Sequence, residues 1–552
     1  MRNPLLLLVC LAWAGLCQAQ QAWVPQWEQS LPFAPTHVGI GHNNGWAYAA
    51  NDKQLCALAT DSGKLRWQLT WAEVLPKAQA IQSVWPLWEA GILLVADTRP
   101  NTPLQAAVEA ATGKVLWSTY RFPLISQANG LFLPGANLLL VGTPEGLVAI
   151  DAKTGALLWQ SMGFRGAPCL ALQPAARAGT LVIANYAPLR WQAGGFRNQL
   201  VCIDINTGNI LWEQPYKGFL ERKLTGQGTT GRLVEQDSSI VLELNGRQRF
   251  GLATGKPLLT AAFESTLATA APRTAGTLLA TGLYSAVAPP QTDPAGNLYW
   301  LDFSSRQRQY IRKVRQSNGT AVWASPEIKQ AGCAPRLWVT GNRVVVQFGG
   351  MVERQALVQY RQADGSEVET TLADLVPLGP HRVLALDADS GRLQWVLEML
   401  PGGLVDTRVY GDSLLVCTPG QLSCHLLADG RQVWKLSLKE AEIGKAKALW
   451  LSAAGKPVVA GADGVAAVTY GPAGPTWLAK RIKGLGLPKQ AAAPYCILPA
   501  ANGHAGAYDA DSNQLWLNKA AQATEWIVSP NSDVVYGIGK GQILKLVLPK
   551  KP

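Results

Sequence analysis

The sequence predicts an all-β fold, a β-propeller built from four-stranded antiparallel blades. Two observations support this prediction. A short phrase ending in tryptophan recurs along the chain, and apolar, strand-like segments recur with it while no helical periodicity stands out. In addition, 552 residues is too long for one ordinary compact domain, so a fold that grows by repetition is favoured.

The composition excludes two other classes of protein. With 48% hydrophobic and 16% charged residues, the chain is too apolar and too weakly charged to be disordered over its length. Its 54 Gly and 35 Pro exclude a long coiled coil. The 21 Trp are unusual even for this length and need an explanation.

Residues 1–19 have the pattern of a secretory signal peptide. Arg2 supplies a positive charge, segment 5–16 is apolar, and residues 17–19 (Cys-Gln-Ala) suit a signal peptidase, so we expect cleavage after Ala19. A membrane-anchoring helix is the alternative, but the apolar segment is shorter than the about 20 residues that span a bilayer.

A lipoprotein signal fits less well than a cleaved signal peptide. It needs a small residue before the acceptor cysteine, and Leu16 precedes Cys17 while Val9 precedes Cys10. No later apolar stretch is long enough to span a bilayer. We therefore expect residues 20–552 to form an exported propeller, periplasmic or secreted, without a transmembrane segment.

The repeated phrase sets the length of one structural unit. Its clearest copies read AIDAKTGALLW, CIDINTGNILW and ALDADSGRLQW, and in seven copies the Trp follows a Gly by four residues. These seven copies end at Trp67, Trp117, Trp159, Trp212, Trp323, Trp395 and Trp434. With three degenerate copies, nine intervals cover the 450 residues between positions 63 and 513, a mean of 50. A period of this size is typical of solenoids and propellers.

The phrase reads as a strand, a tight turn and a second strand. Asp151 and Thr154 accept hydrogen bonds in such a turn, and Gly155 supplies the positive φ that closes it. Trp159 is large and flat enough to cover a neighbouring sheet. The residue six before the Gly is small, which predicts tight packing at that place. It is Ala57, Ala107, Ala149, Cys202, Ala385 or Cys424.

Each unit has a further apolar strand upstream, such as GILLVAD, NLLLVGT and TLVIAN, and a less regular strand before that, which makes four. Eleven such units can be counted. The last has no closing Trp strand, and we expect the segment around Trp27 to supply it, so that the two termini pair and close the ring.

Seven cysteines remain after the signal peptide, so at least one lacks an intrachain partner. Cys417 and Cys424 flank a Thr-Pro-Gly turn and are the best candidates for a disulfide. The favoured alternative is that these cysteines are small buried core residues.

The A-x-D-x-x-T-G-x-x-x-W phrase resembles the repeat of the PQQ-like (quinoprotein-type) β-propellers, over most of residues 23–548. That family includes quinoprotein alcohol dehydrogenases and BamB-like outer-membrane assembly factors. The resemblance implies eight blades, whereas eleven units are counted. Either three units are not full blades, or the ring is larger, or there are two rings, and we favour one ring.

Little in the sequence supports an enzyme. The resemblance implies that a PQQ-dependent dehydrogenase would hold PQQ and calcium near adjacent cysteines, and no Cys-Cys pair occurs. The GQGTTG segment (226–231) lacks a βαβ context, and the five His are scattered without metal-ligand spacing. We therefore expect no cofactor, no metal and no catalytic residue, with a PQQ-dependent dehydrogenase as the alternative.

Three long insertions, 186–198, 284–307 and 349–380, interrupt units four, six and seven. Equivalent loops of a propeller emerge on one face, so we expect these loops to cluster. Exposed aromatic and Arg side chains are typical of binding sites, although the loops could instead cover one another. The candidate partner-binding residues are Tyr186, Arg190, Trp191, Phe196, Arg197, Tyr299, Trp300, Arg354, Tyr360 and Arg361.

The formal net charge is +12, and segments 306–315 and 479–489 are basic. For an exported protein this indicates lipid head groups, acidic glycans or acidic proteins, and we expect no nucleic acid. A solvated basic face without a partner is the alternative. We expect a non-enzymatic protein-interaction or assembly scaffold of the bacterial envelope, or else a lectin-like binder of acidic glycans.

Overall fold

A computed structural model describes most of the chain. The described residues are 21–41, 43–78, 81–97, 103–122, 124–126, 130–143, 146–161, 169–174, 179–185, 198–217, 232–243, 246–262, 266–270, 277–285, 287–302, 308–317, 319–329, 333–361, 367–398, 402–490, 494–500, 502–519, 522–528 and 533–549.

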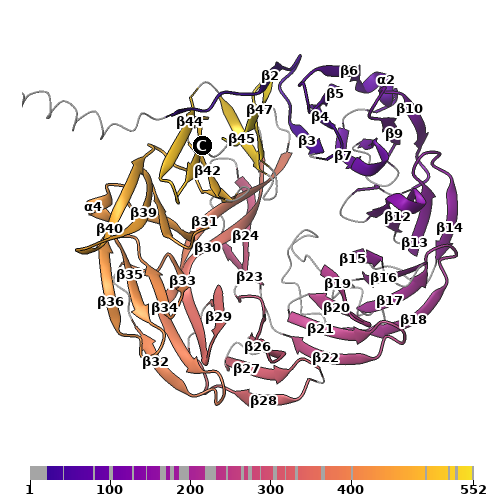
Figure 1. The fold of residues 1–552 in the computed structure, drawn as a ribbon. Coiled ribbons are helices and arrows are strands. Elements are labelled where there is room, and N and C mark those ends of the chain that lie inside the picture. Colours follow the sequence, from indigo (N-terminus) through magenta and orange to yellow (C-terminus); the bar gives the residue numbers. More distant parts are fainter. Residues whose placement is uncertain are drawn as a thin grey trace, which may run out of the picture.

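The strands of the described residues form eleven sheets, which are the blades of one ring (Figure 1). In each blade four antiparallel strands follow one another from the inside of the ring to its rim. The predicted all-β propeller is confirmed, and the ring has eleven blades. The α-helices in the described part are the single turns α2 (Trp71–Val74) and α4 (Leu438–Ala441).

Blades one to four lie on the right of Figure 1. Their strands are β3 (His37–Gly41), β4 (Trp46–Ala50), β5 (Gln54–Ala59) and β6 (Leu65–Thr70); β7 (Ile81–Leu87), β8 (Ile92–Asp97), β9 (Gln105–Glu109) and β10 (Val115–Thr119); β11 (Gly130–Leu133), β12 (Leu138–Thr143), β13 (Gly146–Asp151) and β14 (Leu157–Ser161); β15 (Cys169–Pro174), β16 (Thr180–Asn185), β17 (Gln199–Asp204) and β18 (Ile210–Pro215). Two 3-10 turns, η1 (Trp88–Ala90) and η2 (Pro134–Ala136), lie between strands of blades two and three.

Blades five to eight continue the ring along the bottom and up the left of Figure 1. Their strands are β19 (Arg232–Gln236), β20 (Ser239–Glu243), β21 (Gly246–Gly251) and β22 (Pro257–Ala262); β25 (Gln291–Thr292), β26 (Asn297–Asp302), β27 (Tyr310–Arg315) and β28 (Ala321–Ala324); β29 (Arg336–Thr340), β30 (Arg343–Arg361), β31 (Glu367–Asp387) and β32 (Leu393–Leu397); β33 (Asp406–Tyr410), β34 (Ser413–Cys417), β35 (Gln421–Leu426) and β36 (Gln432–Ser437).

Blades nine to eleven return to the N-terminal segment. Their strands are β37 (Ala446–Leu451), β38 (Pro457–Gly461), β39 (Gly464–Gly471) and β40 (Gly474–Arg481); β41 (Lys489–Gln490), β42 (Tyr495–Pro499), β43 (Ala505–Asp509) and β44 (Gln514–Asn518); β45 (Ala523–Val528), β46 (Val534–Gly539), β47 (Gln542–Val547) and β2 (Trp27–Ser30).

The repeated turn has the predicted chemistry. Asp151 Oδ1 accepts from the backbone N–H groups of Lys153 and Thr154, at 3.0 and 2.8 Å, and from the Thr154 hydroxyl at 2.9 Å. Gly155 follows with φ of +72°. The carboxylate thus replaces solvent for three donors while the glycine reverses the chain.

The repeated tryptophans join neighbouring blades. The indole of Trp159 at the end of blade three lies against Gly208 in the turn of blade four, and its Nε1–H donates to the carbonyl of Ile205 at 3.0 Å. Seven tryptophans of the described chain make this pair of contacts with the next blade. They are Trp27, Trp67, Trp117, Trp159, Trp212, Trp323 and Trp395. Leu259 takes this position against Gly319.

The small residue of each phrase lies opposite the closing tryptophan on the neighbouring strand. Cys202 pairs with Trp212 across β17 and β18, and Ala149 pairs with Trp159 across β13 and β14. Both small residues are buried, so a larger side chain would compete with the indole for space.

The N-terminal segment bridges the last two blades. β1 (Gln21–Ala22) lies parallel to β44, and β2 then pairs antiparallel with β47. Between them Trp23 is buried, and its indole donates to the Val547 carbonyl at 2.8 Å. β2 is therefore the rim strand of blade eleven, which leaves no open junction between the first and last blades.

Blade six differs from the prediction. The sequence suggested that TLLATGL (277–283) is a strand of blade six and that 284–307 is an insertion within it. Instead, β26 inside that segment is a core strand of blade six, and the TLLATGL segment belongs to β24 (Thr277–Ser285), which pairs with β30 of blade seven. Both segments are apolar, so only the long-range pairing distinguishes them.

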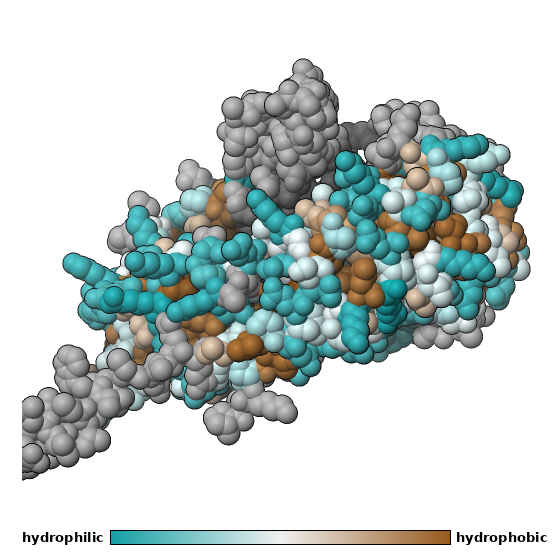
Figure 2. Space-filling view, turned by 90° about the horizontal axis from the view of Figure 1, so that it is seen from above, coloured by the Kyte–Doolittle hydropathy of each residue, from teal (hydrophilic) through white to brown (hydrophobic). Residues whose placement is uncertain are grey.

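The view in Figure 2 shows hydrophilic side chains over most of the described surface, with apolar side chains in separate patches. Exposed aliphatic residues occur on the rim strands of eight blades, for example Leu158 on β14 and Val433 on β36. Among the described residues, no helix has the length and apolar character needed to cross a membrane.

Candidate functional site

An additional sheet extends from blade seven, and we call it the arm. It consists of β23 (Thr266–Ala270), β24 and the distal halves of two strands, residues 351–361 of β30 and 367–378 of β31. In Figure 1 these strands lie inside the outline of the ring. The arm is the described element that departs furthest from the four-stranded blade.

Two glycines mark the point where the arm leaves the blade. The register between β30 and β31 shifts between Phe348 and Gly350, and Gly349 and Gly350 have φ of +71° and +123°. A Cβ on Gly349 would lie 2.2 Å from the Pro380 carbonyl oxygen. Only glycine fits there, because backbone atoms cannot give way as a flexible side chain can.

A buried polar network supports this junction. Gln347, 1% exposed, donates through Nε2 to the Gly349 carbonyl at 2.8 Å and accepts from the hydroxyl of Thr407 at 2.8 Å. Gly349 N–H donates to Cys333 and Met351 N–H donates to Val405, both to backbone carbonyls. The bulge is therefore fixed by hydrogen bonds to blade eight as well as to blade seven.

The network ends on a charge cluster between blades seven and eight. Asp406 accepts from Arg336 Nε and Nη2 at 2.8 and 3.1 Å, and from Arg408 Nη2 at 2.9 Å. Burial alone would lower the pKa of Arg336, but its hydrogen bond and charge interaction with Asp406 raise it. Burial lowers the pKa of Arg408, since Asp406 only partly compensates and Arg336 adds repulsion.

Five of the candidate partner-binding residues lie outside the described residues. They are Tyr186, Arg190, Trp191, Phe196 and Arg197.

Tyr299 and Trp300 do not lie in an exposed loop, so the prediction of exposure was wrong for both. They are 1% and 5% exposed in the core strand β26, because this segment is part of blade six. The Tyr299 hydroxyl donates to Asp293 at 2.9 Å, and burial, followed by this hydrogen bond, raises its pKa. Burial alone would raise the pKa of Asp293, but hydrogen bonds from Asn297 and Tyr299 lower it.

The remaining three candidates lie on the arm. Arg354, Tyr360 and Arg361 all belong to the distal half of β30, and Arg354 is 8% exposed. Arg354 lies opposite Tyr284 of β24 on one side and Asp374 of β31 on the other. Arg354 is therefore a buried residue within the arm and not an exposed contact residue.

Part of the basic segment 306–315 is used within the fold. It forms β27, where Lys313 Nζ donates to the Ala388 carbonyl at 2.9 Å and lies 5.2 Å from the centre of the Tyr299 ring. Arg312 forms an ion pair with Asp302. Lys313 therefore links blades six and seven, whereas the Arg312–Asp302 ion pair joins two strands of blade six.

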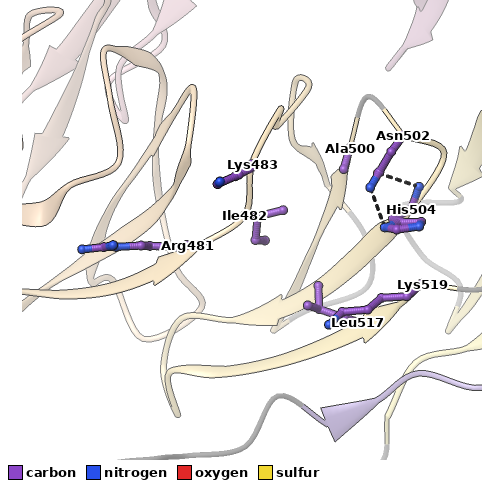
Figure 3. Close-up of a pocket in the computed structure, with 9 residues that line it drawn as sticks. Arg481, Ile482, Lys483, Ala500, Asn502, His504, Leu517 and Lys519 are labelled. Carbon is purple, nitrogen blue, oxygen red and sulfur yellow. Dashed lines mark hydrogen bonds between the residues drawn. The ribbon is translucent and has the colours of Figure 1, made fainter.

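The basic segment 479–489 borders a cavity of about 200 Å³ between blades nine and ten (Figure 3). Lys483, Lys519 and His504 line it, with Asn502 Nδ2 donating to His504 Nδ1 at 2.7 Å. Figure 3 shows Arg481 directed away from His504, and Arg481 forms an ion pair with Glu442. The cations therefore do not all converge on the cavity.

Within the described part of the chain, no three or more His, Cys, Asp or Glu side chains are placed to hold a metal ion. The six cysteines whose side chains the structure describes are buried and are not joined to one another by disulfides, including Cys417 and Cys424, and no two of them are adjacent in the sequence. The residues present do not reproduce the adjacent cysteine pair that the resemblance to PQQ enzymes implied.

Sequence reasoning missed the residues at the root of the arm, Gln347, Asp406 and Thr407. A signal was present in the sequence, because Gly349-Gly350 directly follows the apolar strand RVVVQF. A glycine pair at that place indicates a bulge or sharp bend. The polar partners come from blade eight, and no local pattern indicates them.

Comparison with known proteins agrees with this architecture. A curated relative, the outer membrane protein assembly factor BamB of Burkholderia pseudomallei (strain K96243), is 33% identical over 160 residues, which cover 28% of this chain. The chain spans 38% of the length of that relative.

Two solved structures are similar at lower identity. BamB from Moraxella catarrhalis is 15% identical, with 80% of this chain and 96% of that chain covered and a TM-score of 0.27. A quinohemoprotein alcohol dehydrogenase from Pseudomonas putida HK5 is 12% identical, with 68% of each chain covered and a TM-score of 0.25.

The family described as outer membrane protein assembly factor BamB matches residues 21–255 and 307–474. The gap between the two matches contains β23 and β24 of the arm, and blade ten lies beyond the second match. Since the matched residues are well over half of the 552, the chain belongs to this BamB family of PQQ-like β-propellers.

Proposed function

We propose that this protein is an exported, non-enzymatic scaffold that binds other proteins of the bacterial envelope during outer-membrane protein assembly. The family match over residues 21–255 and 307–474 is the observation that carries the proposal. The curated relative is named an assembly factor. The expected signal peptide, residues 1–19, agrees with export.

The fold suits such a role. A ring in which seven tryptophans each attach one blade to the next by an indole contact and a hydrogen bond is a rigid platform. Elements that project from a rigid platform are where binding function usually lies, because the platform positions them without adding mobility. The arm, anchored through Gln347 and Thr407, is such an element.

A capture experiment tests the proposal. The purified chain, immobilised through a C-terminal tag, is incubated with detergent extracts of envelopes from the source organism, and retained proteins are identified by mass spectrometry. We expect the same outer-membrane assembly proteins in each replicate. A folded chain that repeatedly retains nothing beyond an empty matrix would contradict a scaffold role.

Two assays test the alternatives. Incubation with PQQ and calcium, followed by a dye-linked assay of alcohol and sugar oxidation, should show no turnover; turnover would favour a PQQ-dependent dehydrogenase. A glycan array should show no retention of acidic glycans. A lectin that uses Trp300 is disfavoured because this side chain is 5% exposed.

A further inference from the structure

Positive charge is concentrated on the innermost strands of four consecutive blades. These are β29, β33, β37 and β41 of blades seven to ten, which together contain four Lys or Arg residues and one acid, Asp406. The innermost strands of the other seven blades contain one Arg, Arg232, and two acids, Glu235 and Glu525. We call the four cations the cation arc. They are Arg336, Arg408, Lys447 and Lys489.

The cation arc follows one face of the ring along its inner edge. Each of its residues is among the first three of its strand, and the innermost strands run in the same direction because the blades share one strand order. Figure 1 shows β29 and β33 on the inner side of blades seven and eight, and β33 lies in contact with β37. The four cations therefore succeed one another, one in each blade.

The two arginines of the arc share one carboxylate. Asp406 accepts from Arg336 and from Arg408, whose side chains remain 39% and 23% exposed. Arg408 Nε also donates to the Leu449 carbonyl of blade nine at 3.3 Å, and its guanidinium lies 5.7 Å from the centre of the Trp338 ring. One carboxylate cannot neutralise two guanidinium groups, so a positive charge remains at this place.

The two lysines are bound to neutral groups. Lys447 Nζ donates to the Leu485 carbonyl at 2.8 Å, and Lys489 Nζ donates to the Trp526 carbonyl of blade eleven at 2.6 Å. Lys447 is half-buried and Lys489 is exposed. A carbonyl takes one of the three N–H donors of an ammonium group and leaves its charge uncompensated.

The place of these charges favours a chain over a membrane as the occupant. A flat bilayer meets the most exposed groups of a protein first, whereas Arg408 and Lys447 are half-buried on strands that border the inside of the ring. An extended polypeptide is thin enough to follow such an edge from one blade to the next. Its carboxylates would form charge-assisted hydrogen bonds, which are stronger than those of neutral acceptors.

We propose that the cation arc binds an extended acidic segment of a partner protein, with Asp or Glu carboxylates taking the donors that the backbone carbonyls leave free. Charge complementarity would select the segment and speed its association. This inference rests on the proposed scaffold function and names the kind of segment that the scaffold captures. It also gives the positive net charge of the chain a role.

Peptide binding to the full chain tests the inference. The probe is a fluorescent peptide of five Glu-Ser repeats, and the control is a peptide of five Lys-Ser repeats. Physiological ionic strength limits the general attraction of a positive chain, because the Debye length is then about 8 Å. We expect the Glu-Ser peptide to bind at least roughly tenfold more tightly and to slow backbone hydrogen exchange in β37 but not in β14.

Paired variants separate the charge of the arc from its contacts with neighbouring blades. The double variant Lys447→Gln, Lys489→Gln keeps a donor at each position and removes the charge, so it should bind the Glu-Ser peptide at least roughly fivefold more weakly. Lys447→Arg, Lys489→Arg keeps the charge and should bind like the wild type. If the double Gln variant fails to fold in urea titrations, Lys489→Gln alone should still weaken binding roughly twofold or more.

The matched control removes the same charge elsewhere on blades eight and nine. It is the double variant Lys435→Gln, Lys456→Gln. Lys435 is exposed on the rim strand β36, and Lys456 Nζ donates to the Asp511 carbonyl at 2.7 Å from the opposite end of blade nine. This control should keep the affinity of the wild type. A loss equal to that of the arc variant would overturn the site, because it would show only a general effect of net charge.

Two further outcomes would also overturn the proposal. Equal affinity for the two peptides would show that the arc does not select acidic segments. Binding of phosphatidylglycerol vesicles that depends on Lys447 and Lys489, without binding of the Glu-Ser peptide, would replace the acidic segment by lipid phosphate. If the double Gln variant still retains envelope proteins in the capture experiment, the scaffold function stands without the cation arc.

Discussion

Gly208 and Trp159 are in direct contact across the junction of blades three and four, and the contact leaves no room for a methyl group. A Cβ on Gly208 would lie 2.5 Å from Cε3 of the indole, and Gly208 has φ of +73°. The glycine of the repeated phrase is therefore required by the packing between blades and also by the turn within its own blade.

We expect Gly208→Ala to lower the free energy of unfolding by about 2–4 kcal/mol, through a left-handed alanine and an overpacked indole. Gly179→Ala is the matched control, since Gly179 lies in the same blade with φ of +80° and the nearest atom to its Cβ is 3.7 Å away. It should cost only about 1–2 kcal/mol. Urea unfolding followed by circular dichroism measures both, and equal costs would show that the indole is not the constraint.

The closure of the ring depends on Trp23. Its indole is 4% exposed and donates to Val547, while Asn518 Nδ2 donates to the Trp23 carbonyl at 2.8 Å. Trp23→Ala should cost about 3–5 kcal/mol and should increase proteolysis of blade eleven first. Val24→Ala is the control, because Val24 is 72% exposed and should change neither property. A variant as protease-resistant as the wild type would show that other contacts close the ring.

The hydrogen bond between Thr407 and Gln347 at the root of the arm can be removed by a substitution that keeps the side-chain volume nearly unchanged. Thr407→Val removes the hydroxyl that donates to Gln347 Oε1 and leaves a buried acceptor unpaired, at an expected cost of about 1–3 kcal/mol. Gln347→Met alone leaves both the Thr407 hydroxyl and the Gly349 carbonyl without their partner, so the loss in the double variant should be smaller than the sum of the two single losses. Urea unfolding of the four proteins measures the coupling. Additive losses would mean that the two side chains do not act as a pair.

Features that depend on short-range sequence patterns could be predicted, whereas features that depend on pairing between distant segments could not. The turn Asp151-Thr154-Gly155 and the spacing to Trp159 are short-range, and they led to the propeller and to eleven units. The assignment of Tyr299 and Trp300 failed because TLLATGL and NLYWLD are both apolar strands, and the choice depends on the distant pairing of Leu279 with Gln359. The network from Gln347 to Asp406 joins two blades, so no single segment shows it.

His425 should make stability fall at acidic pH. It is 7% exposed, its Nδ1–H donates to the Gly430 carbonyl at 3.0 Å, and Nε2 faces the Ser423 hydroxyl at 3.0 Å. Burial lowers the pKa of this histidine from 6.5. The unfolded chain therefore binds the proton first as the pH falls, so His425 favours the folded state fully above its unfolded pKa and progressively less below it.

We expect the wild type to lose no more than about 1.4 kcal/mol per pH unit through this group between pH 7 and 5, and His425→Gln to flatten that slope. His37→Gln, at an exposed position, is the control. Urea unfolding at several pH values gives the slopes. Parallel curves for the wild type and His425→Gln would contradict a role for this histidine.

The cysteines should be inert in the folded protein although the chain is expected to be exported. Burial raises the pKa of Cys56 and Cys496 to about 12, and it raises the pKa of Cys417 as well, so few thiolates are present at neutral pH. In a Cys169→Ser background, the six described thiols should react with a maleimide only after unfolding in guanidinium. Peptide mapping without reductant should show Cys417 and Cys424 as separate, alkylated thiols, because each packs as a small apolar residue in the core of blade eight. A Cys417–Cys424 crosslink in freshly purified protein, or rapid labelling of the folded chain, would show that these strands open far more readily than their burial implies.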